Sequence, residues 1–212
     1  MQKTLNYLFD PLCGWCYGAG PAISALAEEG GVSLAMRPTG LFSTGGTRLM
    51  DEEFAAYAWA NDQRISRLTG QPFSERYREQ VLGNRKQLFD SGPATLALSA
   101  VALAQPEAEL QALKAIQAAR YVDGLDVTNP KILREVLEGL DLHAAAAMFG
   151  AMAGQLLTRN GARVAAAQEM MRRFGLRGVP ALILDDGQRK RPLDANLMFG
   201  EPGALRDSLA NA

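Results

Sequence analysis

Segments with the pattern of β-strands occur only near the two ends of this chain. They cover residues 4–9 and 32–36 at the front, and residues 181–184 and 191–193 near the end. A helix is expected over residues 13–29, kinked near Pro21, so the first two strands should pair in parallel through a helical crossover. Residues 185–187 (Asp-Asp-Gly) form a turn signal, so the last two strands should form a hairpin. The four strands together predict one mixed sheet.

The long middle of the chain is typical of helices. Residues 50–158 contain no convincing strand, and Pro93, Pro106 and Pro130 each stand where a first helical turn accepts proline. We expect five or six helices there, then a helix over 162–174 and a closing helix over 202–209. The predicted class is therefore α/β. A discontinuous sheet domain is formed by residues 1–45 and 159–212, and an all-helical domain, 46–158, is inserted into it.

Composition and charge exclude several classes of protein. Hydrophobic residues make up 48% and charged residues 21% of the 212, which is typical of a globular chain. The formal net charge is −1, so nothing global indicates binding to nucleic acid or to an anionic membrane. No apolar run is long enough to cross a bilayer. The first strand follows Met1 almost at once, which leaves no room for a leader before the cysteines, and so predicts a cytoplasmic protein.

The two cysteines form a C-x-x-C motif, Cys13-Gly14-Trp15-Cys16, directly after the first strand. Cys13 is placed at a helix start, where unpaired backbone N–H groups favour a thiolate. Cys16 follows one turn later and can attack a mixed disulfide formed at Cys13. Gly14 permits close approach of a partner backbone. The motif at this position predicts thiol–disulfide exchange.

A cysteine pair of this spacing is also compatible with sites that do no redox chemistry. Two ordinary cysteines at a helix start would look the same, because a bare C-x-x-C is a weak signal. Two cysteines and one histidine cannot complete a four-ligand zinc site within one chain. Carboxylate ligands or a site shared in a dimer would be needed, so we predict no metal. A disulfide scaffold would need more cysteines.

Two separated motifs resemble one known family. The segment 9–18 (FDPLCGWCYG) is similar to the active-site segment of the DsbA-like thioredoxin superfamily, especially its FrnE-like cytosolic members. The segment 176–181 (LRGVPA) is similar to the cis-proline loop of DsbA. The order of elements agrees along most of the chain, including the helical insertion. The resemblance implies a thioredoxin-like fold.

The resemblance also implies roles for particular residues. Cys13 is the expected nucleophile and Cys16 the resolving cysteine. Pro180 is the expected cis-proline facing them, and Val179 is expected to pair with an extended substrate. The sequence departs from DsbA itself in the dipeptide, which is Gly14-Trp15 where DsbA has Pro-His. Neither residue is charged, so we expect a reductase or isomerase rather than a strong oxidant.

Three further side chains have two interpretations each. Asp10 is expected to form an Asx turn before Pro11, with proton transfer to Cys16 through water as the alternative. Trp15 either contacts substrates or packs over the active-site helix. Arg177 is either a solvated surface charge or a support for a thiolate or an acidic substrate.

The leading prediction is a thiol–disulfide oxidoreductase of the reductase or isomerase type. Its substrates would be disulfide- or dithiol-containing proteins or small thiols. No bound cofactor is expected, with glutathione or another thiol system as redox partner, and the protein would be a monomer or a homodimer. The alternatives are a glutathione-dependent isomerase or transferase on the same fold, and a redox-sensing binding protein. Related chromene-carboxylate isomerases typically have serine at the first cysteine position, so Cys13 argues against that class.

Overall fold

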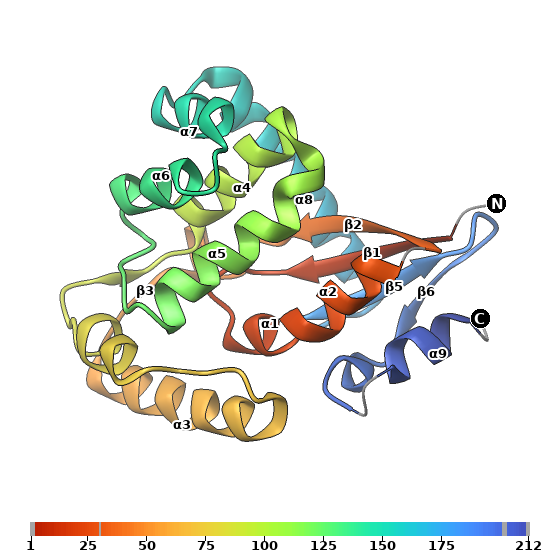
Figure 1. Ribbon diagram of the computed structural model, residues 1–212, viewed down its shortest axis with the longest axis horizontal. Coiled ribbons are helices and arrows are strands. Elements are labelled where there is room, and N and C mark those ends of the chain that lie inside the picture. The colour runs from red at the N-terminus through yellow and green to blue at the C-terminus, as the bar shows by residue number, and fades with distance from the viewer. Residues whose placement is uncertain (1–2, 30, 201–202, 211–212) are drawn as a thin grey trace.

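A four-stranded mixed sheet forms the centre of the protein (Figure 1). The computed structural model describes residues 3–29, 31–200 and 203–210. The strands are β1 (Lys3–Phe9), β2 (Val32–Pro38), β5 (Ala181–Asp185) and β6 (Lys190–Leu193), in the order β2-β1-β5-β6. β1 pairs in parallel with β2 and antiparallel with β5, and β5 pairs antiparallel with β6. The predicted mixed sheet is confirmed.

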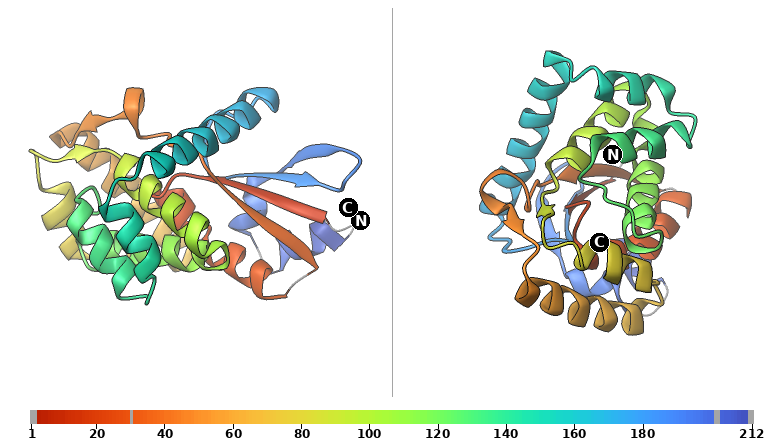
Figure 2. Two further views of the ribbon diagram at one scale, coloured as in Figure 1. Left: turned by 90° about the horizontal axis from the view of Figure 1, so that it is seen from above. Right: turned by 90° about the vertical axis from the view of Figure 1, so that its left-hand side faces the viewer.

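Helices cover both faces of the sheet (Figure 2). On one face, Leu8, Ala181 and Ile183 pack against apolar side chains of α8 (Gly154–Arg173). The alternate residues of the same strands point to the opposite face and join the main core, with α2 (Gly20–Glu29) over them. Side chains alternate along a strand, so a central strand covered on both sides is buried at consecutive positions. This explains why five consecutive residues of β1, Leu5–Phe9, are buried.

The helical block lies beyond the ends of β1 and β2 (Figure 1). Its elements are α3 (Glu52–Thr69), η2 (Tyr77–Leu82, wound as a π-helix), α4 (Gly92–Ala104), η3 (Pro106–Ala108), α5 (Glu109–Tyr121), α6 (Pro130–Glu138) and α7 (His143–Gly150). The prediction of no strand here is wrong in one detail. β4 (Leu88–Phe89) pairs with β3 (Arg48–Leu49), which follows the short turn η1 (Thr44–Gly46). Two-residue strands are too short for any periodic pattern.

The active-site helix is two helices rather than one. α1 (Gly14–Gly18) ends before α2 begins at Gly20, so the break lies at Ala19, slightly before the kink predicted near Pro21. Pro21 has no N–H to donate to the carbonyl of Tyr17, four residues earlier. The side chain of Gln71 donates to that carbonyl instead, at 3.1 Å. The helical block therefore satisfies a backbone group that proline leaves free.

Helix α8 begins earlier than predicted, at Gly154 instead of residue 162. The extra turns contain Gly161 and lack a side-chain N-cap, so the local sequence gives little sign of them. Contacts with α4 compensate, because Ser99 on α4 donates to the Asn160 side chain at 2.8 Å. The helix runs through the predicted domain boundary at 158/159, and the main core contains residues from both sides of it. The division into two domains stays a prediction.

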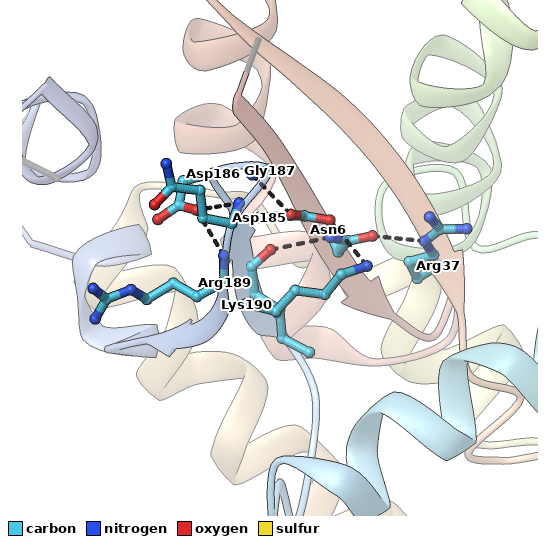
Figure 3. Close-up of polar contacts among 9 residues, drawn as sticks. Asn6, Arg37, Asp185, Asp186, Gly187, Arg189 and Lys190 are labelled. Carbon is cyan, nitrogen blue, oxygen red and sulfur yellow. Dashed lines mark hydrogen bonds and ion pairs between the residues drawn. The ribbon is translucent and has the colours of Figure 1, made fainter. Parts of the chain in front are cut away.

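Polar side chains link neighbouring strands of the sheet (Figure 3). Asn6, buried in β1, donates to the Ile183 carbonyl at 3.3 Å and accepts from Arg37 on β2 at 2.9 Å. Asp185 and Lys190 form an ion pair of 2.9 Å across the hairpin. These contacts join all four strands of the sheet, each to its neighbour.

The chain ends in a 3-10 turn, η4 (Ala195–Met198), and the short helix α9 (Ala204–Ala210). The predicted closing helix is confirmed from residue 204 onward. Its predicted first residue, Pro202, and Gly30 in the predicted end of the front helix lie outside the described residues. Within the described part of the chain, no helix combines the length and apolar character needed to cross a membrane.

Candidate active site

The two cysteines lie where the chain passes from the end of β1 into helix α1. A tight turn follows Phe9, in which the Cys13 N–H donates to the Asp10 carbonyl at 3.1 Å. The buried hydroxyl of Tyr121, on α5, donates to the Leu12 carbonyl at 2.7 Å. The turn is therefore held both locally and by the helical block. It places Cys13 at the N-cap of α1 and Cys16 inside its first turn.

Both thiols are free, and they differ in environment. Cys13 keeps 6% of its surface exposed and Cys16 only 1%. Burial raises the pKa of the Cys16 thiol well above its usual value, and hydrogen bonding to the neighbouring Cys13 side chain raises it further. Cys16 is thus stabilised as a neutral thiol behind Cys13. The more accessible sulfur is the first cysteine, which is the order that attack followed by resolution requires.

The loop before β5 meets the cysteines. The peptide bond between Val179 and Pro180 is cis. The Cys13 thiol donates to the Val179 carbonyl at 3.5 Å, and Pro180 is buried. This contact spans 166 positions of sequence, and the sheet creates it, because Ala181 pairs with Leu8 of β1. The structure brings together the two motifs that carried the family resemblance.

Asp10 forms the expected Asx turn. One carboxylate oxygen accepts from the Leu12 N–H at 2.9 Å, and the other accepts from Ser91 Oγ at 2.7 Å and from the Phe42 N–H at 3.2 Å. Burial raises the pKa of this carboxyl, and these hydrogen bonds lower it. Asp10 is close enough to Cys16 for its charge to raise the pKa of that thiol. Its role in proton transfer stays a prediction.

The remaining predicted residues lie around the cysteines at different depths. Trp15 is half-buried, and its ring meets Phe199 edge-on at 5.2 Å. The guanidinium of Arg64 lies over the same ring at 5.6 Å. Packing over the active-site helix is therefore observed for Trp15, while substrate contact stays a prediction. Arg177 is exposed and makes no hydrogen bond or ion pair with the described residues, so its electrostatic role also stays a prediction.

Sequence reasoning missed the residues that the helical block contributes. Phe73, Tyr77 and Tyr121 form a buried aromatic cluster beneath α1, and Tyr17 of α1 packs on it, stacked on Tyr121 at 4.8 Å. Asp62 on α3 is buried against Gly14 and accepts from the Tyr77 hydroxyl at 2.9 Å. The residues that the helical block contributes, Asp62, Phe73, Tyr77 and Tyr121, are about 50 to 110 positions from the motif and carry no local signal of their proximity.

The site holds no candidate metal centre. Among residues 3–29, 31–200 and 203–210, no group of three or more histidine, cysteine, aspartate or glutamate side chains is placed to bind an ion. The chemistry that the arrangement supports is that of sulfur: an accessible thiol, a buried second thiol and a backbone carbonyl beside the first.

A sheet of this topology with a C-x-x-C motif opposite a cis-proline loop defines a thioredoxin-like protein. The model of the DSBA-like thioredoxin domain family matches residues 4–202. The chain belongs to this family of disulfide oxidoreductases. A comparison with curated protein sequences gives no match.

Solved structures agree with this assignment. The chain is similar to the cytosolic disulfide reductase DsbM from Pseudomonas aeruginosa, with 33% identity, a TM-score of 0.87, and coverage of 98% of this chain and 97% of that chain. A second structure of that protein, with GSH, gives 32% identity, a TM-score of 0.85 and coverage of 98% of both chains. A 2-hydroxychromene-2-carboxylate isomerase shares the fold at 18% identity, with a TM-score of 0.63 and coverage of 98% and 95%.

Proposed function

We propose that the protein is a cytosolic disulfide reductase that works through Cys13 and Cys16 and is recycled by glutathione. The observation that carries the proposal is the contact of the Cys13 thiol with the Val179 carbonyl, with Cys16 buried behind it. The similarity to a cytosolic disulfide reductase, also solved with GSH, supports both the direction of electron flow and the thiol partner.

The reaction proceeds in two exchanges. The Cys13 thiolate attacks one sulfur of a substrate disulfide, so a mixed disulfide forms and the first substrate thiolate leaves. The Cys16 sulfur then attacks Cys13, which forms the internal disulfide and releases the second substrate thiolate. Two molecules of glutathione reduce the internal disulfide and become glutathione disulfide. Two electrons therefore pass from glutathione to the substrate in each cycle.

The residues around the sulfurs have separable tasks in this scheme. Val179 offers its backbone to an extended substrate beside Cys13, because the cis bond to Pro180 turns that peptide toward the cysteines. Burial keeps Cys16 a neutral thiol, so Cys13 attacks the substrate disulfide first, and Cys16 gives up its proton when it attacks the mixed disulfide. Tyr7 donates its hydroxyl to the Cys16 carbonyl at 3.2 Å and fixes the first turn of α1.

Turnover of insulin disulfides with glutathione tests this proposal. The wild-type protein should reduce insulin catalytically, Cys13→Ser should be inactive, and Cys16→Ser should accumulate a mixed disulfide on Cys13. Loss of activity in both variants without a trapped adduct would contradict the two-exchange scheme. Glutathione-dependent isomerisation that is independent of Cys16 would favour the isomerase alternative. Disulfide formation without any turnover would favour a redox-sensing binding protein.

A further inference from the structure

Asp62 of α3 lies directly against the active-site dipeptide. A Cβ atom added at Gly14 would be 2.5 Å from Asp62 Oδ1 and 3.2 Å from Ile65 Cδ1. The first distance is far inside van der Waals contact, so the carboxyl group occupies the space that any other residue at position 14 would need. A titratable side chain of the helical block therefore reaches the residue next to Cys13.

The second oxygen of this carboxyl accepts a hydrogen bond from within the helical block. Asp62 Oδ2 accepts from the Tyr77 hydroxyl at 2.9 Å, and the side chain as a whole is buried. Arg120 of α5 is also buried, and its guanidinium lies over the rings of Tyr77 and Tyr121 at 5.4 and 5.6 Å. Its Nε and Nη2 atoms have no hydrogen-bond partner among the described residues. The carboxyl has a hydroxyl and a distant cation as partners, and no direct ion pair with the described residues.

Burial, one hydroxyl group and one cation set the pKa of Asp62. Burial raises the pKa of Asp62 to about 7, while the Tyr77 hydroxyl and the Arg120 charge lower it. Burial is the main cause that raises the pKa of Tyr121, beneath α1, and the charges of Asp62 and Cys13 raise it further. Asp62 and Cys13 thus both lie within electrostatic reach of Tyr121.

We propose that Asp62 is a positioning residue that couples the redox state of the Cys13–Cys16 pair to a proton held in the helical block. The inference deepens the proposed function and rests on its redox pair. When the pair is reduced, the Cys13 thiolate repels a second negative charge, and Asp62 holds a proton. When the disulfide forms, that charge disappears, and Asp62 releases the proton.

The proton balance of substrate reduction supports this role. A substrate disulfide needs two electrons and two protons to become two thiols. A pair in the thiolate–thiol form supplies two electrons but only one proton, which leaves Cys16 as the internal disulfide closes. Asp62, which lies against the residue next to Cys13, supplies the second proton. Reduction by glutathione returns both protons, one to Cys16 and one to Asp62, because two glutathione thiols lose two protons as they form their disulfide.

Infrared difference spectra of the oxidised and reduced protein near neutral pH test the coupling without any protein substrate. The reduced wild-type protein should show a protonated carboxylic acid band that weakens on oxidation. Asp62→Asn should lack the band. The matched control is Glu53→Gln, an exposed carboxylate at the start of the same helix, which should leave the band unchanged. A wild-type spectrum without a redox-sensitive acid band would overturn the proposal.

The equilibrium of the pair with glutathione, followed from about pH 6 to about pH 8, gives a second readout. Relative to Asp62→Asn, the wild-type equilibrium should shift toward the disulfide by roughly fivefold or more as the carboxyl ionises, because a like charge nearby disfavours the thiolate. Tyr77→Phe removes a hydrogen bond to the carboxylate and should move this shift to higher pH.

If the equilibrium with glutathione depends on pH in the same way in the wild type and in Asp62→Asn, the coupling is overturned and the proposed reductase function stands. Failure of the pair to form a disulfide in any variant would instead overturn the proposed function. If Asp62→Asn does not fold, the direction of the Tyr77→Phe shift and the wild-type infrared spectrum decide the question.

Discussion

A double-mutant cycle at Gly14 and Asp62 tests whether the helical block dictates the residue next to Cys13. Alanine at position 14 would place its Cβ 2.5 Å from Asp62 Oδ1, so the two side chains must move apart. Overpacking of this kind costs about 1–3 kcal/mol. The backbone of Gly14 does not require a positive φ, so the substitution also gains about 0.4–1 kcal/mol from the unfolded chain. Gly14→Ala should therefore destabilise the wild-type protein.

The same change should be tolerated once the carboxyl is gone. In an Asp62→Ala background only the contact with Ile65, at 3.2 Å, remains, and the coupling between the two changes should be about 1–3 kcal/mol. Urea unfolding of the reduced proteins measures all four free energies. Gly161→Ala, on a helix with no described atom near its added Cβ, is the control and should be neutral or stabilising. An equal cost of Gly14→Ala in both backgrounds would refute the steric argument.

Two further predictions concern stability. Because the pKa of Asp62 is raised to about 7 in the folded protein, its contribution is fully present below the unfolded value near 4 and is lost as pH rises through 7. The free energy of unfolding of the wild type should thus fall relative to Asp62→Asn over that window, by at most about 4 kcal/mol, and a constant difference in urea unfolding across it would contradict this. Tyr121→Phe leaves the buried Leu12 carbonyl without its donor and should cost about 1–3 kcal/mol. Tyr57→Phe, at an exposed position, should change stability by less than about 0.5 kcal/mol, and equal effects of the two changes would show that the bond to Leu12 is not stabilising.

The order of elements could be predicted from the sequence because each signal is local. The apolar run of β1, the alternation of β2 and the turn at 185–187 are visible within a few residues. The cysteine motif and the Val179-Pro180 pair are also local. Their proximity could be predicted once the strands next to them were assigned to the same sheet. The helix boundaries were less accessible, since contacts between α4 and α8 hold a glycine-containing segment helical.

The polar surroundings of the site could not be predicted in the same way. Asp62 is one of 23 acidic residues, and nothing near it in sequence distinguishes it. Its importance comes from burial against Gly14 and from Tyr77, which are contacts made by the tertiary packing of α3 on α1. The glycine in the motif was interpreted as an opening for a partner backbone. That interpretation stays a prediction, and the structure shows a carboxyl group of the same chain against the position where a Cβ of residue 14 would lie.

The reduction potential of the Cys13–Cys16 pair tests the central claim, that the protein is a reductase, most directly. The measurement equilibrates the protein with mixtures of reduced and oxidised glutathione and quantifies free thiols. The uncharged Gly14-Trp15 dipeptide leaves the helix start as the main stabiliser of the thiolate, so the potential should lie between roughly −270 and −180 mV. A cytosolic glutathione pool would then keep much of the pair reduced and able to donate electrons. A potential above about −150 mV, near that of DsbA, would show that the protein is an oxidant and contradict the account.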